Sequence, residues 1–224
     1  MKVLGELNGE GFACSIVQDD DGRVEFVADA DIDADGANGQ SGARAAYMLY
    51  NAGSELLGNG GMTMRGNKVV GAADWFRDIV ILGPGGQPRE FPGGIIASKT
   101  AYRFHAKDRD DPATYVDSET VPYIVVPPLI IQRTAGAVLG CHCAATDLRT
   151  GTCVTGIVAD VGPRTKTGEL SIAMARALGI PSSPRTGGVE KPVIKYELWP
   201  GRHGEVKGER IALQRSNGTY ILPA

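Results

Sequence analysis

The chain has 224 residues, 42% of them hydrophobic, and carries a formal net charge of −3 at a pI of about 5.7. It contains no run of 18 apolar residues, so we expect a globular protein without a membrane-spanning helix. No basic cluster is present to neutralise phosphates, which argues against nucleic acid and anionic membranes as partners. The length suits one all-β domain, and we assign residues 1–224 to a single domain.

Short β-rich runs predict a mainly β protein, a barrel or a sandwich, with few helices. They are separated by many of the 31 Gly and 13 Pro, and they do not alternate with helices as in a parallel α/β protein. We expect strands at residues 23–27, 78–82, 94–98, 101–104, 122–126, 137–144, 152–159, 193–198, 210–214 and 219–222. Helices are expected only at residues 42–57 and after Glu169.

The first ten residues lack the long apolar segment of a secretory signal, because Gly5, Glu6 and Asn8 interrupt it. We therefore expect action outside the cytoplasm by another export route, or after removal of a leader.

Acidic residues are concentrated in the first 35 positions. They are Asp19, Asp20, Asp21, Asp29, Asp31, Asp33 and Asp35. Such a run steers cationic ligands, or is simply a solvated loop. The segment from Asp31 to Gly36 also has the D-x-D-x-D-G pattern of half a calcium loop, but its twelfth position is Gly42, not a bidentate carboxylate. A cation, a sugar amine and a plain loop therefore remain open interpretations.

Four cysteines could form two disulfides, but a chain of this size does not need them. We expect buried thiols rather than bridges or a metal site. Cys141 and Cys143 should share one face of a strand, with His142 on the other, and Cys153 should lie on the next strand across a turn at residues 149–151.

The most informative segment covers residues 158–180, which follow a strand expected from residue 153. An apolar, β-branched run ends at Asp160, and Gly162 and Pro163 cannot continue a strand. Apolar side chains then recur at helical spacing and end at Gly179, which predicts a helix with Glu169 near its N-terminus. These side chains are Leu170, Ala173, Met174, Ala177 and Leu178.

The short loop between Asp160 and Glu169 brings two carboxylates within several Å. Glycoside hydrolysis needs such a pair, one acid for the leaving oxygen and one base or nucleophile. The plain alternative is a turn residue at Asp160 and a favourable first-turn charge at Glu169.

Several separated motifs resemble glycoside hydrolase family 75, the fungal-type chitosanases and their bacterial members. They lie at residues 31–37, 115–127, 158–163, 167–180 and 185–189. In order and spacing the resemblance covers roughly residues 28–201. The turn after Asp160 is also similar to double-psi β-barrel proteins such as rare lipoprotein A and the expansins, so a barrel with a double-psi-like core is expected.

The resemblance implies inverting cleavage of chitosan, with Glu169 as proton donor and Asp160 as base. We expect Asp31, Asp33, Asp35, Tyr115, Asp117, Glu119, Lys166 and Arg185 to bind the substrate. This reaction needs no metal and no cofactor, so neither is expected.

Two alternatives stay open. One is hydrolysis of peptidoglycan glycan strands with the same pair, and the other is a noncatalytic barrel that binds polysaccharide, since a fold does not fix a chemistry. The aromatic residues that could stack on sugar rings, or equally form the core, are Trp75, Tyr115, Tyr123, Tyr196 and Trp199.

Overall fold

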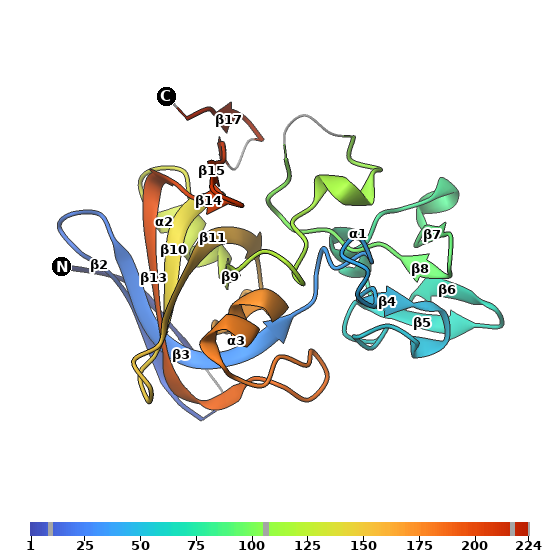
Figure 1. Ribbon diagram of the computed structural model, residues 1–224, viewed down its shortest axis with the longest axis horizontal. Helices are drawn as coiled ribbons and strands as arrows, with labels where there is room; N and C mark the ends of the chain where they lie inside the picture. Colours follow the sequence, from blue (N-terminus) through green and yellow to red (C-terminus); the bar gives the residue numbers. More distant parts are fainter. Residues whose placement is uncertain (9–10, 105–107, 216–217, 224) are drawn as a thin grey trace.

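The structure is a computed structural model that describes residues 1–8, 11–104, 108–215 and 218–223. Figure 1 shows a strand-rich barrel on one side and a lobe of short elements on the other. We call this second part the lobe and define it as residues 34–122. Buried apolar residues of both parts belong to one hydrophobic cluster, which includes Phe26 and Ile157 from the barrel and Met62 and Phe76 from the lobe.

A closed barrel of six strands forms the larger part. Around the barrel the order is β3 (Val24–Asp33), β12 (Glu169–Ser171), β9 (Tyr123–Val126), β11 (Cys153–Val161), β10 (Cys141–Asp147) and β13 (Val189–His203). The ring closes because the long strand β13 pairs with both β10 and β3. Two ladders, β3–β12 and β9–β11, are parallel and the others are antiparallel. The expected mainly β barrel is confirmed.

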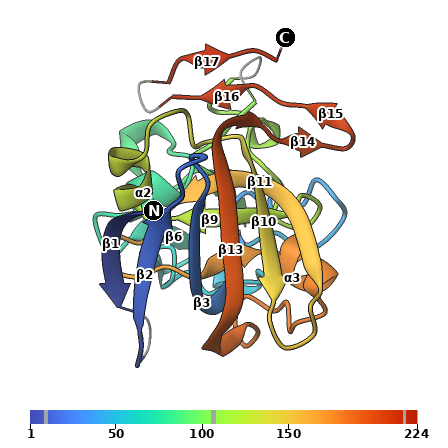
Figure 2. The same cartoon turned by 90° about the vertical axis from the view of Figure 1, so that its left-hand side faces the viewer.

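Further strands extend the barrel at its edges. β1 (Lys2–Asn8) and β2 (Ala13–Gln18) continue the sheet beyond β3. In Figure 2 they lie beside β3, and the small C-terminal strands lie above the end of β13. Those C-terminal strands are β14 (Glu205–Val206), β15 (Glu209–Arg210), β16 (Leu213–Gln214) and β17 (Tyr220–Ile221). The barrel also carries the helices α2 (Pro128–Arg133) and α3 (Ile172–Leu178).

The side-chain alternation of β3 determines which acidic residues leave the core. Every second residue from Val24 to Ile32 is apolar and buried, and together with Ile124 and Leu170 these residues fill the barrel. Because successive side chains point to opposite faces, Asp31 and Asp33 lie on the outer face, toward the lobe.

The lobe consists of short strands and single helical turns. Its elements are β4 (Tyr47–Met48), η1 (Leu49–Asn51), β5 (Met62–Arg65), β6 (Lys68–Gly71), α1 (Phe76–Ile79), η2 (Pro84–Gly86), β7 (Glu90–Phe91), β8 (Ile95–Ile96) and η3 (Pro112–Thr114). The lobe leaves the barrel at the end of β3 and returns to it at β9, and in Figure 1 it lies beside the barrel, next to the end of β3.

The expected helix at residues 42–57 is wrong. Tyr50 and Asn51 both have positive φ angles, 59° and 54°, which a right-handed helix cannot contain. A Cβ at Gly53 would lie 2.1 Å from the carbonyl oxygen of Ala46, so the chain folds back on itself there. Tyr47 belongs instead to strand β4, and its side chain is buried.

The helix after Glu169 exists but is shorter than expected. Glu169 belongs to β12, and α3 begins at Ile172 after an N-cap at Ser171, whose hydroxyl accepts from the Met174 amide. Gly179 ends the helix in the left-handed conformation, as expected. The predicted apolar stripe was wrong in part, because Leu170 is in the strand and Ala177 is exposed.

Most expected strands of the barrel are confirmed, but two in the lobe are wrong. Residues 78–82 contain the end of α1 and isolated bridges at Val80 and Leu82, because the Val80 amide bonds the Phe76 carbonyl in a helical turn. Residues 101–104 form only a bridge at Arg103, because the Ala101 amide bonds a barrel side chain and the Tyr102 amide bonds the Ala159 carbonyl.

All four cysteines are free thiols. Cys141 and Cys143 share the buried face of β10 and His142 lies on the other face, as expected. The His142 ring contacts the ring of Trp199 there. Cys153 is exposed, which corrects the expectation of a buried thiol, since it begins β11 immediately after the turn at Gly151. Tyr123 and Tyr196 are fully buried, so they are core residues and cannot stack on a sugar.

Candidate active site

A cleft of about 1460 Å³ lies between the barrel and the lobe. More carboxylates than cations line it. The carboxylates are Asp31, Asp33, Asp35, Glu55, Asp78, Asp110, Asp160 and Glu169. The cations are Lys99, Arg103, Arg109, Lys166 and Arg185. The cleft therefore offers a ligand a mainly negative surface, in which a smaller number of lysine and arginine side chains are interspersed.

Asp160 and Glu169 lie on either side of Val125. Strand β9 runs between β11 and β12, and Val125 is in register with Asp160 in one ladder and with Glu169 in the other. Since neighbouring strands are about 4.8 Å apart, the Cα atoms of the two acidic residues are separated by roughly 10 Å. Both side chains line the same cleft.

Backbone amides fix the Asp160 carboxylate. Its Oδ1 accepts hydrogen bonds from the Ala101 amide at 2.9 Å and the Val161 amide at 2.7 Å. Burial raises the pKa of Asp160 well above its usual value, and the nearby Asp33 charge adds to this, while the two amides oppose it. The expected position at a strand end is confirmed, because β11 ends one residue later.

Glu169 has a different environment. None of the described residues donates a hydrogen bond to its carboxyl group. Burial raises its pKa well above the usual value, and the charges of Asp33 and Asp160 act in the same direction, with Lys166 opposing them. Of the two carboxyls, Glu169 therefore has less to stabilise its ionised form.

The D-x-D-x-D-G segment divides into two parts. Asp31 is in register with Glu169, has a half-exposed side chain and forms an ion pair with Lys166. Asp33 and Asp35 are buried, each with 7% of its surface exposed. Gly36 has a φ of +78°, and a Cβ there would lie 1.9 Å from the Val116 carbonyl oxygen, so only glycine allows this turn.

Asp33 is held by two donors. Its Oδ1 accepts from the Asp35 amide at 2.8 Å, and its Oδ2 accepts from the Tyr123 hydroxyl at 2.8 Å. That hydroxyl also lies 3.0 Å from the Asp35 carbonyl oxygen. Burial raises the pKa of both Asp33 and Asp35, and for Asp35 the neighbouring carboxylates add to the effect.

The other residues expected to bind substrate are divided between the cleft and other surfaces. Tyr115 lines the cleft, with its hydroxyl donating to the Arg109 carbonyl at 2.8 Å. Asp117 accepts from the Glu119 amide, and Glu119 pairs with Arg176 at 2.9 Å. Neither acidic residue lines the cleft, so the structure assigns them local structural contacts.

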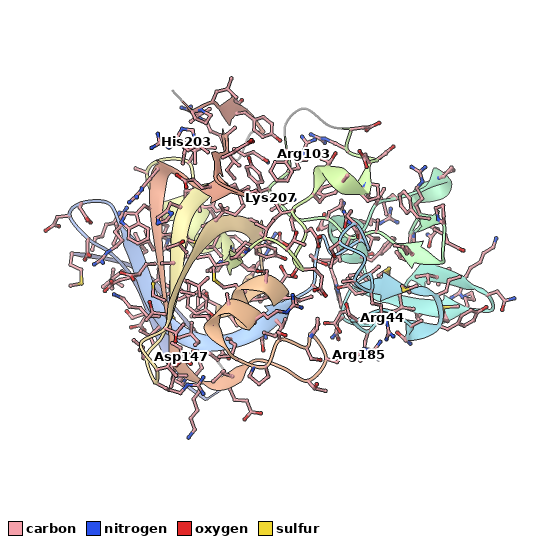
Figure 3. All side chains as sticks on the ribbon, in the orientation of Figure 1. Arg44, Arg103, Asp147, Arg185, His203 and Lys207 are labelled. Carbon is pink, nitrogen blue, oxygen red and sulfur yellow. The ribbon has the colours of Figure 1, made fainter. Side chains whose placement is uncertain are left out.

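Arg185 lines the cleft but is engaged with the lobe. Its Nη2 donates to the carbonyls of Asn51 at 2.6 Å and Gly53 at 2.8 Å, and lies 3.3 Å from that of Glu55. Figure 3 shows Arg185 at the gap between the barrel and the lobe, beside β4 and β5. It joins the two walls of the cleft.

Sequence reasoning did not select several cleft residues of the lobe. Glu55 and Asp78 fell in segments expected to be regular helix and strand, and Lys99 and Arg103 carry no motif. Trp75, one of the aromatic residues that could stack on a sugar, lines the cleft with 56% of its surface exposed. An exposed tryptophan cannot be recognised from its sequence neighbours alone.

No protein-family model matches the sequence, and no curated protein matches it. Within the described residues no helix is both long and apolar enough to span a membrane.

Proposed function

We propose that the protein is an endo-acting glycoside hydrolase that cleaves the β-1,4 bonds of chitosan, or of a related glucosamine polymer, with inversion. The observation that carries the proposal is the position of Asp160 and Glu169 on either side of Val125 in an open cleft. Inverting glycosidases use carboxyl groups about 6.5–9.5 Å apart, which leaves room for a water. Strand positions roughly 10 Å apart are compatible with that separation.

In the proposed mechanism Glu169 is the acid and Asp160 the base. Asp160 Oδ1 is held by two amides, so Oδ2 is left to accept a proton from water. The water oxygen attacks the anomeric carbon as the bond to the leaving oxygen breaks, and Glu169 donates its proton to that oxygen. The absence of hydrogen-bond donors to Glu169 among the described residues favours its protonated form.

The lining of the cleft supports a cationic sugar polymer as substrate. Asp31 is half exposed at the cleft, and its surface ion pair with Lys166 is weak enough for a glucosamine ammonium to replace it. Trp75 presents an exposed ring on the opposite wall, where it can stack on a sugar. The two parallel ladders of the barrel support a double-psi core of the kind found in rare lipoprotein A and the expansins.

A second candidate is hydrolysis of peptidoglycan glycan strands with the same pair. Arg103 and Arg109 line the cleft, and neither forms an ion pair with another described residue. Guanidinium groups bind carboxylates, which peptidoglycan carries and chitosan does not.

One experiment separates these functions. The protein is incubated with chitosan, with fully acetylated chitin and with purified sacculi, and new reducing ends are measured. Release from chitosan supports the first proposal, and release from sacculi alone supports the second. Binding without any release would support the noncatalytic barrel.

A further inference from the structure

Three carboxylates from two separate segments meet in the wall of the cleft. Asp33 and Asp35 come from the end of β3 and the turn after it, and Asp160 comes from the end of β11. One carboxylate oxygen from each lies within 4.8 Å of the other two. Asp31, the first acidic residue of the D-x-D-x-D-G segment, is not part of this group and pairs with Lys166 instead.

The group contains an unsatisfied buried atom. Asp35 is more than nine-tenths buried, and its Oδ1 has no hydrogen-bond partner among the described residues. No described lysine or arginine forms an ion pair with Asp33, Asp35 or Asp160. A buried carboxylate without a partner is costly, and three together repel one another. A cation among the three oxygens would offset this repulsion and give the Asp35 oxygen a partner.

We propose that Asp33, Asp35 and Asp160 bind one Ca²⁺ ion. Calcium takes oxygen ligands at about 2.3–2.6 Å, so two ligands on opposite sides of the ion are about 5 Å apart, and three oxygens that all lie within 4.8 Å of one another fit around one such ion. Magnesium usually keeps several waters and is bound through only one or two carboxylates, so a group of three carboxylates favours calcium. The cleft is open, so waters complete the coordination.

Because Asp160 is also the proposed base, and this step rests on the proposed function, bound calcium competes with catalysis. A carboxylate oxygen that coordinates the ion cannot accept a proton from the attacking water. Calcium is thus an inhibitor that occupies the site when substrate is absent.

The test is calcium binding by the full chain after EDTA treatment. Binding of CaCl₂ is measured by calorimetry at neutral pH, together with the melting temperature. Wild type should bind one Ca²⁺ and melt at a higher temperature when calcium is added. Asp35→Asn should weaken binding at least about tenfold, and Asp31→Asn should change it by less than about threefold. Asp160→Asn, on the other segment, is the second ligand variant and should also lose binding.

The proposed calcium site is rejected if the wild type binds no calcium, or if Asp35→Asn and Asp31→Asn bind calcium equally well. A loss in Asp31→Asn with full binding in Asp160→Asn would likewise overturn it in favour of a site formed by the loop alone. Circular dichroism confirms that each variant is folded before its binding is compared.

Activity assays keep this inference separate from the proposed function. If calcium inhibits hydrolysis by the wild type, and inhibits Asp35→Asn less than it inhibits Asp31→Asn, both the calcium site and the proposed function are supported. Calcium binding by a protein that cleaves no glycan would uphold the site and reject the proposed function. Activation by calcium would uphold the site and reject Asp160 as base.

Discussion

Asp160 and Glu169 are separated by a single strand, β9, whose Val125 is in register with both. The segment between them leaves β11 and crosses the end of β9, where the Gly162 amide donates to the Val126 carbonyl at 3.1 Å. It then returns as β12 on the far side. This crossover places the two acidic residues on either side of the same strand, and a simple hairpin would have placed them on adjacent strands.

Replacing either member of the pair should abolish hydrolysis without unfolding the protein. We expect Asp160→Asn and Glu169→Gln each to lower kcat by about a thousandfold or more, because each removes a proton transfer from the transition state. The measurement is the rate of reducing-end release from chitosan, with the melting temperature as a check on folding.

Asp78→Asn is the matched control, since Asp78 lines the same cleft from the lobe side. It should retain most of the wild-type rate. A Glu169→Gln variant that is as active as this control would exclude Glu169 as the proton donor.

The strands of the barrel and the choice of Asp160 and Glu169 as an acidic pair could be predicted from the sequence, because local patterns determine them. β-branched runs at residues 122–126 and 152–159 do form strands, and Gly162 with Pro163 does end one. The strand register that places Val125 between the two acidic residues could not be predicted. It depends on a long-range pairing of three strands, which no local pattern encodes.

The lobe was harder to predict because its conformation depends on tertiary contacts. The pattern at residues 42–57 suits a helix, but left-handed Tyr50 and the close approach at Gly53 override it. Asp33, Asp35 and Asp160 also could not be grouped from sequence. Asp160 is 125 positions from Asp35, and the motif itself suggested Asp31 as the third member.

Arg185 should matter for the stability of the cleft wall. Arg185→Ala removes donors to the carbonyls of Asn51 and Gly53, so we expect a loss of about 1 kcal/mol in unfolding free energy. We also expect faster proteolysis within residues 49–60, measured by mass spectrometry of the fragments. Arg44→Ala, an exposed arginine near the same gap in Figure 3, is the control. Equal effects of the two substitutions would contradict a joining role for Arg185.

Only one thiol should react in the native protein. Cys153 is exposed, whereas burial raises the pKa of Cys14 to about 11 and raises those of Cys141 and Cys143 as well. A thiol reagent at neutral pH should therefore modify one cysteine per chain before unfolding and four after it, because the thiolate is the reactive form. Cys153→Ser should reduce the native value to zero. Rapid native labelling in that variant would show that a buried cysteine is accessible.

The turn between β10 and β11 should give the protein part of its resistance to acid. Asp147 is 1% exposed and accepts hydrogen bonds from the Arg149 side chain at 2.9 and 2.7 Å. These bonds hold the pKa of Asp147 below its ordinary value of 3.8. A carboxyl with a depressed folded pKa stabilises the native state above its unfolded pKa, and this contribution disappears as the pH falls through the folded pKa.

Asp147→Asn should therefore lower the urea midpoint at pH 7, and the difference from wild type should shrink as the pH falls below about 4. Urea titrations of both proteins at a series of pH values measure this difference directly. Asp78→Asn serves again as the control, because Asp78 forms no ion pair with a described residue and should show little difference at any pH. If the Asp147→Asn difference is the same at pH 3 as at pH 7, the contribution of Asp147 comes from packing and neutral hydrogen bonds, and its charge is not involved.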